Sequence, residues 1–333
     1  MSNRCRTLLF FFVPIIAILS AVFFAASAFA DERGGEEATT VFVMRVSGMI
    51  SPVASDFVAS SLRKAADIDA QIIILELDTP GGLDTSMRAI VKEMNASRTP
   101  IVVYVAPSGA RAASAGAFIT IAAHVAAMSP GTNIGAAHPV AVGEKMDPVM
   151  AEKATNDAAA YIRSLAEQHG RNAVWAEDAV RKSISATESE ALKLGVIDLI
   201  ATDRADLMKQ LDGRVVRTAA GNISLRTAKP VIINEEMGFR HRLLSFVSDP
   251  TVAYLLMMIG FYGIFFELSN PGTIAPGIIG AISLVLAFYA FQTLPVNYAG
   301  LILIVIGIIL FVLEIKVTSY GLLTLGGISC LTL

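Results

Sequence analysis

Ser114 lies in a stretch of small residues, GARAASAGAF, where no bulky neighbour along the chain surrounds its hydroxyl. Two roles suit a serine in this setting. It can be the N-cap of a following helix, because a serine side chain accepts hydrogen bonds from the free N–H groups of the first turn. It can also be a nucleophile, provided that a base takes its proton. Taken alone, the stretch favours the N-cap, so the nucleophile requires support from other residues.

Two residues could be that base. Lys153 lies near the start of a segment with helical spacing, where the helix dipole and loss of water would both favour the neutral amine. His138, directly before Pro139, is of a type that accepts protons near neutral pH without special surroundings. The ordinary alternatives are a solvated surface lysine and a histidine in a turn. The position at a helix start favours Lys153, and His138 is the alternative base.

The motif LDTPGGL, from Leu77 to Leu83, places two glycines directly after a predicted buried strand. Paired glycines permit positive φ and let a ligand backbone come close, so the N–H of Gly82 could point at a developing oxyanion. The N–H of Ala115 would lie in the first turn of the next helix and could be the second donor. A plain strand-to-helix turn is the alternative for the glycines.

Residues 38–235 alternate strand and helix patterns. Nearly continuous apolar runs, such as QIIILELD (71–78) and PIVVYVA (100–106), are typical of parallel strands buried on both faces. Further strands are predicted at 40–46 and 196–201, and helices at 52–68, 84–97 and 114–125. This alternation predicts an α/β domain with a mainly parallel sheet and right-handed crossovers.

The two ends of the chain are apolar and predict membrane targeting. Arg4 and Arg6 precede an apolar run, and AFA at 28–30 fits a signal-peptidase site, so we expect a signal peptide over 1–30. An uncleaved membrane anchor is the alternative. Either way, the soluble domain, 31–240, would be exported. We therefore expect it on the extracytoplasmic, periplasmic side of the cell's inner membrane.

Residues 250–333 form the predicted multi-span transmembrane region. Three spans are expected, each close to the ~20 apolar residues that a bilayer core requires. They cover 251–268, 273–293 and 298–313. A fourth apolar run reaches Leu333 with no polar flank after it, so we expect a truncated fourth span and a natural protein that continues.

Composition excludes several classes of function. The net charge of −3 gives no support for nucleic-acid binding. The two cysteines, Cys5 and Cys330, lie in the apolar ends, so the soluble domain has no thiol for a disulfide or a zinc site. With four histidines in the chain, a histidine-rich metal site is not expected. We therefore predict no metal and no cofactor.

Taken together, LDTPGGL, ARAASAGAFI and AAMSPGTNIGAAHPV resemble the Clp-protease/crotonase-like superfamily, which includes signal peptide peptidase A and the Clp proteolytic subunit. AEKATNDAAAYIRSLAEQHGRNA and SATESEALKLGVIDLIA make the chain more similar to the NfeD family of membrane-bound serine proteases. The resemblance covers roughly residues 40–333. It implies the Clp/crotonase-like fold, followed by an all-α transmembrane region.

The resemblance also implies a serine endopeptidase with a Ser–Lys dyad. The family's serine corresponds to Ser114, its lysine to Lys153 and its oxyanion glycine to Gly82, whereas the Clp subunit uses a histidine at a place comparable to His138. The implied partner is a stomatin-like membrane protein whose hydrophobic C-terminal region is the substrate, and we expect a homodimer in the lipid bilayer. The alternative is a non-proteolytic membrane scaffold that binds a stomatin-like protein. An acyl-CoA enzyme is disfavoured, because export separates the domain from that cytoplasmic substrate.

Overall fold

The computed structural model describes residues 39–140, 147–270, 274–292, 298–317 and 319–332. The expected signal peptide, 1–30, lies outside the described residues.

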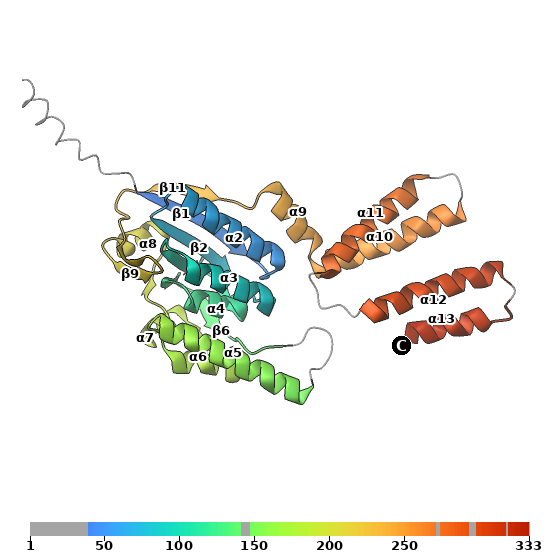
Figure 1. Ribbon diagram of the computed structural model, residues 1–333, viewed down its shortest axis with the longest axis horizontal. Helices are drawn as coiled ribbons and strands as arrows, with labels where there is room; N and C mark the ends of the chain where they lie inside the picture. The colour runs from blue at the N-terminus through green and yellow to red at the C-terminus, as the bar shows by residue number, and fades with distance from the viewer. Residues whose placement is uncertain (1–38, 141–146, 271–273, 293–297, 318, 333) are drawn as a thin grey trace, which may run out of the picture.

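A six-stranded parallel sheet forms the centre of the soluble domain, in the order β11-β1-β2-β3-β5-β8 (Figure 1). Each neighbouring pair in this sheet is parallel. The strands are β1 (Thr40–Ser47), β2 (Ile72–Asp78), β3 (Ile101–Val105), β5 (Val125–Met128), β8 (Leu199–Ile200) and β11 (Val231–Glu235). The sheet confirms the predicted α/β domain.

Side chains of each central strand alternate between two cores, as the pleat of a strand requires. Ile73 and Leu75 of β2 join the larger core, which also contains residues of α2 (Pro52–Asp67), α3 (Asp84–Ala96), α4 (Ala115–Ile121) and α5 (Pro148–Gln168). Ile72 and Ile74 face the smaller core, which is covered by α8 (Arg204–Leu211) and the hairpin of β9 (Val215–Thr218) and β10 (Gly221–Ser224). Burial on both faces explains why these strands are nearly continuous apolar runs.

The helix expected over 114–125 is shorter than predicted. Helix α4 ends at Ile121, and the expected last residue, Val125, instead begins β5 beside β3. The Arg171 guanidinium donates hydrogen bonds of 2.8 Å to the carbonyls of Ile121 and Ala123, which satisfies acceptors that a continued helix would have used. A tertiary contact from a distant segment therefore ends this helix.

A three-stranded sheet and two short helices complete the domain. Strand β4 (Arg111–Ala113) pairs in parallel with β6 (Asn133–Gly135), and β6 pairs antiparallel with β7 (Ser185–Thr187). Helices α6 (Ala173–Arg181) and α7 (Glu188–Lys193) lie near this sheet. The last residue of β4, Ala113, directly precedes Ser114, so this sheet sets where the candidate nucleophile begins.

Five helices follow the domain (Figure 1). They are α9 (Phe239–Val247), α10 (Pro250–Ser269), α11 (Ile274–Gln292), α12 (Tyr298–Lys316) and α13 (Leu322–Thr332). By length and composition, two of the described helices can span a membrane, over 251–269 and 274–291, as expected for the first two spans. The stretches 302–314 and 322–332 are apolar but shorter.

The hairpins α10–α11 and α12–α13 repeat the same contacts at positions 47 residues apart. A Cβ on Gly280 would lie 2.8 Å from the Gly260 carbonyl, and one on Gly327 would lie 3.2 Å from the Gly307 carbonyl. The Glu267 carboxylate accepts a hydrogen bond from the Gly277 N–H, and the Glu314 carboxylate accepts one from the Thr324 N–H. The pairs 260/307, 267/314, 277/324 and 280/327 share one offset. The two hairpins therefore pack in the same way, with glycines where the helices approach each other and a glutamate near the end of the first helix that accepts an N–H from the start of the second.

Candidate active site

Ser114 adopts a backbone conformation that is rare for a residue with a side chain, with φ 52° and ψ −115°. It occupies the N-cap position of α4, but its side chain makes no capping hydrogen bond. The expected N-cap hydrogen bond is therefore absent. The Ser114 N–H donates to the Gly135 carbonyl at 2.9 Å, which holds this conformation against β6. A strained, uncapped serine is the kind of position that clusters at active sites.

Two glycines allow the end of β2 to approach Ser114 closely. A Cβ on Gly81 would lie 2.7 Å from the Ser114 Cβ, and one on Gly116 would lie 2.6 Å from the Thr79 Cγ2. Gly81 also has the positive φ of this turn, 119°. The sequence motif permits a positive φ at either glycine of the pair. In the structure Gly81 has the positive φ, and Gly82 does not.

Gly82 is fixed by a different contact. It pairs with Ile50, whose carbonyl accepts the Leu83 N–H at 2.9 Å, and a Cβ on Gly82 would lie only 2.3 Å from that carbonyl oxygen. Any other residue would displace the Ile50 backbone. In the part of the chain that the structure describes, neither the Gly82 N–H nor the Ala115 N–H donates a hydrogen bond. Both groups are therefore available to a ligand.

A pocket of about 380 Å³ brings Gly82, Ser114 and Ala115 together. Most of its other lining residues are apolar and come from the loop after β2, from α3, from α4, from the segment after β6 and from α5: Leu83, Met87, Phe118, Ala137, Pro139, Val140 and Ala158. Asp84 is the one charged residue among them. The three residues that the sequence predicts to act together share this pocket, and its other side chains add an apolar wall suited to an apolar side chain.

Lys153 does not line this pocket in the structure. It is exposed on α5, in the second turn of the helix, and no contact links it to Ser114 within the described ranges. Its role as the base is therefore still a prediction. Catalytic hydrogen bonds often form only in the substrate complex, so an open arrangement does not decide the question.

An arginine on α3 orients the face of α5 that carries Lys153. Arg88 forms ion pairs with Asp84 at 2.8 Å and with Asp157 at 2.5 Å, and its guanidinium lies 4.5 Å from the ring centre of Tyr161. Lys153 and Asp157 are one turn apart and share a helix face. Arg88 therefore holds the helix face with Asp157 and Lys153 against α3. Asp84, its other partner, lines the pocket, so this face of α5 lies on the pocket side of the helix. Sequence analysis missed the network, although the spacing of Asp84 and Arg88 was visible as an i, i+4 pair.

His138 is held away from the pocket. Its Nδ1 lies 2.9 Å from the Val180 carbonyl, so this nitrogen donates and the ring is directed at α6. Ala137 and Pro139 line the pocket on either side of it in the chain, whereas His138 does not. Alternation of side chains along an extended segment explains the difference. The structure therefore gives the alternative base no position beside Ser114.

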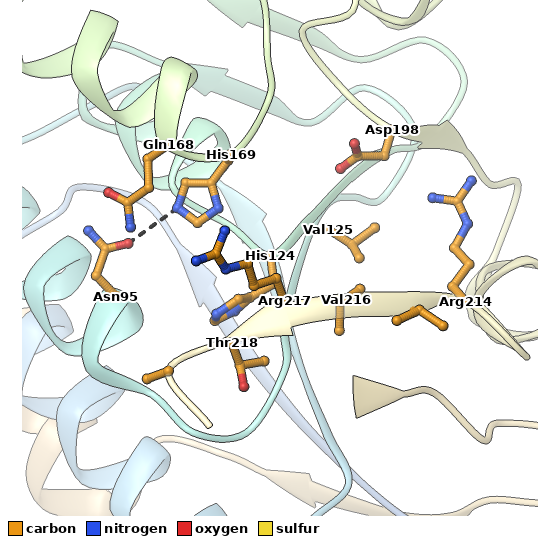
Figure 2. A pocket seen from close by; sticks show the side chains of 12 residues that line it. Asn95, His124, Val125, Gln168, His169, Asp198, Arg214, Val216, Arg217 and Thr218 are labelled. Carbon is orange, nitrogen blue, oxygen red and sulfur yellow. Dashed lines mark hydrogen bonds between the residues drawn. The ribbon is translucent and has the colours of Figure 1, made fainter. Parts of the chain in front are cut away.

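A second cavity of about 500 Å³ lies near the C-terminal ends of α4 and α5, whereas Ser114 precedes the N-terminal end of α4. Figure 2 shows the residues that line this cavity. His124 and His169 line it with ring centroids 6.0 Å apart, and the His169 Nε2 lies 3.3 Å from the Asn95 Oδ1. Desolvation by burial, together with the positive charge of Arg171, lowers the pKa of each imidazole to about 4. These histidines follow the two helices that carry Ala115 and Lys153 near their N-terminal ends.

We expect the stability of the domain to fall as the pH decreases from about 6.5 to 4. In the unfolded chain these histidines bind protons near pH 6.5, whereas the folded domain resists protonation down to about 4. The unfolded state thus binds more protons in this window, which costs up to about 1.4 kcal/mol of stability per pH unit for each histidine and lowers Tm. The fluorescence of Trp175, the chain's single tryptophan, can report this melting in the detergent-solubilised protein.

His169→Gln should make this pH dependence shallower, because it removes one of the two titrating rings. Gln168→Ala changes a neighbouring residue that does not titrate and should keep the full dependence. Equal slopes for the parent and both variants would show that the histidine pair does not control acid stability.

Comparison with protein families divides the chain in the same way as the structure does. The model described as NfeD1b, N-terminal domain matches residues 40–219, and the model described as NfeD integral membrane domain matches residues 251–333. Both the α/β domain and the apolar helices therefore match models of one family.

Two relatives extend over both parts. The chain is 37% identical over 300 residues to the membrane-bound protease PH1510 of Pyrococcus horikoshii, and this match covers 86% of the chain and 66% of the relative. It is 30% identical over 315 residues to the membrane protein NfeD1b of Bacillus subtilis, covering 94% of the chain and 70% of the relative. The chain thus spans about two thirds of the length of these relatives.

The α/β domain is also similar to solved structures. One is described as 1510-N, a membrane protease of P. horikoshii specific for a stomatin homolog, with 35% identity and a TM-score of 0.56 over 63% of this chain and 99% of that one. Another holds a lysine-to-alanine variant of that protease with a substrate peptide, at a TM-score of 0.60 over 63% and 98% of the two chains. A third is a serine-to-alanine variant, at 0.55.

Proposed function

This chain belongs to the NfeD family, and from that premise we propose that it is a membrane-bound serine endopeptidase in which Ser114 is the nucleophile and Lys153 the base. The observation that carries the proposal is the geometry at Ser114. Its strained, uncapped hydroxyl shares a pocket with two backbone N–H groups, those of Gly82 and Ala115, that have no acceptor among the described residues. A nucleophile beside free donors is the arrangement that acyl transfer requires.

In the proposed reaction, the Ser114 Oγ attacks the carbonyl carbon of the scissile peptide bond while the neutral Lys153 amine takes the hydroxyl proton. The carbonyl oxygen becomes an oxyanion that accepts hydrogen bonds from Gly82 and Ala115, each worth about 3 kcal/mol in the transition state. Lys153 returns the proton to the leaving amine as the peptide bond breaks. Water then attacks the ester on Ser114 by the same route and releases the second product.

We propose that substrates are apolar segments of membrane-associated proteins, with a stomatin-like protein as one of them. Two observations support this: the apolar wall of the pocket, and the solved relative that is described as specific for a stomatin homolog. The proposal places the domain on the extracytoplasmic side of the inner membrane, attached to several spans, and includes a homodimer. The α10–α11 hairpin, which is long enough to cross a bilayer, supports the membrane attachment.

We expect the full-length protein in lipid nanodiscs to cleave apolar peptides at least about tenfold faster, by kcat/KM, than polar peptides of equal length. Each methylene group that enters an apolar pocket contributes roughly 1 kcal/mol, so a branched apolar side chain suffices for this ratio. Mass spectrometry of the products would give both rates.

Met87→Gln places an amide in the pocket and should reduce this preference. Val174→Gln makes a comparable change at an exposed position on α6 and should leave it intact. Equal turnover of both peptide classes by the parent protein would contradict the proposed substrate class. Absence of any cleavage, with the fold confirmed, would contradict the peptidase itself.

A further inference from the structure

One side of helix α9 packs against its surroundings. The His241 ring lies against the ring of Phe57 in α2, with centroids 5.9 Å apart. Near the end of the helix, Val247 is 4% exposed and packs among residues of α10 and α11, including Ala253 and Phe291. These contacts hold α9 between the α/β domain and the α10–α11 hairpin (Figure 1).

The other side of α9 carries a row of exposed apolar side chains. Phe239 is 77% exposed, Leu243 is 47% exposed and Phe246 is 63% exposed. Their spacing of four and three residues places them on one side of a helix, roughly opposite His241. Three large apolar side chains in a row are an unfavourable surface in water, so this side is suited to an apolar environment.

Two arginines lie on the flanks of this row. Arg240 and Arg242 are both exposed, one on either side of the apolar stripe. Arg242 also lines a cavity with Glu235 and Glu236, whereas Arg240 forms no ion pair with any described residue. An apolar stripe with a free cation beside it is the composition of helices that lie in the headgroup layer of a membrane.

The position of α9 in the chain, like its composition, indicates a helix at the membrane surface. The helix ends at Val247, and the first stretch able to span a membrane begins at Thr251. Three residues lie between them, so α9 cannot be far from the surface of any bilayer that α10 enters. Phe246, the last residue of the stripe, precedes Thr251 by five positions.

We propose that α9 is an interfacial helix that lies in the headgroup layer, with Phe239, Leu243 and Phe246 inserted among the acyl chains and Arg240 on anionic lipid headgroups. The exposed side of α9 therefore contacts lipid. This inference is independent of the peptidase activity, because it rests on exposure, charge and the start of the first span.

The proposal also orients the domain. Helix α9 contacts α2 at Phe57, in the second turn of that helix, and α2 follows Ile50, the residue that pairs with Gly82. The Ser114 pocket lies beside the C-terminal end of β2, and this end of the sheet is therefore held next to the bilayer. The cavity of His124 and His169, at the other ends of α4 and α5, lies on the side away from the membrane.

Fluorescence quenching in nanodiscs tests this arrangement on the full-length protein. Cys5→Ser and Cys330→Ser remove both native cysteines. Single cysteines are then introduced by Phe246→Cys or Leu243→Cys, with Ser245→Cys and Val174→Cys as controls at other exposed positions, and each is labelled with a nitrobenzoxadiazole dye. Emission from Trp175 confirms the fold of each variant.

Lipids with a nitroxide on the upper acyl chain should quench the dye at 243 and 246 at least about twice as strongly as at 245, and should leave 174 unquenched. Equal quenching at 174, 245 and 246 would overturn the proposal. Replacing phosphatidylglycerol with phosphatidylcholine should weaken quenching at 246, as should Arg240→Gln but not Arg98→Gln, a change to an exposed arginine just after α3. Quenching that is indifferent to lipid charge would overturn the assignment of Arg240 to anionic headgroups.

Discussion

Ser114→Ala is expected to reduce peptide cleavage by about 10⁴-fold or more, because Ser114 carries the one hydroxyl among the described residues that line the pocket. The variant should fold normally. Ser114 makes no side-chain capping bond, and alanine fits the same backbone, so the free energy of unfolding should change by less than about 0.5 kcal/mol. The measurement is kcat/KM for an apolar peptide, with thermal melting of the same samples.

Ser108→Ala is the matched control. Ser108 is an exposed serine six residues earlier, outside the residues that line the pocket, and its removal should preserve activity. Cleavage that persists in pure Ser114→Ala protein would reject Ser114 as the nucleophile. Loss of cleavage together with a large fall in melting temperature would mean that Ser114 acts through the fold.

Lys153→Ala should lose activity almost as completely as Ser114→Ala, because members of one catalytic unit do not contribute additively. Lys153→Arg should fail too, since a guanidinium keeps its proton and cannot act as a base. His138→Gln should retain activity within a few-fold, because the ring is directed at the Val180 carbonyl and does not line the pocket. Steady-state kinetics of the three variants measure this.

Lys92→Arg, at an exposed position on α3, controls for the exchange of one cation for another. A reversed pattern, with Lys153→Arg active and His138→Gln inactive, would identify His138 as the base. Full activity in Lys153→Ala would remove the dyad from the mechanism. The exposed position of Lys153 makes this the most informative of the substitutions, because the proposed contact with Ser114 has to form when a peptide binds.

The sheet and the meeting of Gly82, Ser114 and Ala115 in one pocket could be predicted because each has a local signal. Strands buried on both faces are short apolar runs, so β2 and β3 were recognisable without knowledge of their neighbours. The glycine pair follows β2 directly, where loops of parallel sheets form binding sites, and Ser114 lies in the connection between β3 and β5. The two membrane helices of sufficient length follow from hydropathy alone.

The features of the fold and the site that could not be predicted depend on contacts between distant segments. The first residue of β5, Val125, was placed in a predicted helix, because the Arg171 guanidinium that bonds the carbonyl at the end of α4 comes from a distant part of the chain. The strain at Ser114 arises from its hydrogen bond to Gly135 and its contact with Gly81, and neither can be inferred from spacing. The Arg88 network that orients α5 likewise joins residues 69 positions apart. Local patterns thus indicated the candidate residues, while tertiary contacts determine their geometry.

Covalent labelling of the full-length protein with a fluorophosphonate tests most directly whether Ser114 is an activated nucleophile. The probe reacts with serines whose hydroxyl is activated, and peptide mapping by mass spectrometry locates the adduct without knowledge of the natural substrate. We expect one adduct, on Ser114, that is absent from Ser114→Ala, greatly reduced in Lys153→Ala and unchanged in Ser108→Ala. An unlabelled parent protein with an intact fold, or an adduct that persists in Ser114→Ala, would contradict the account and favour a non-proteolytic membrane scaffold.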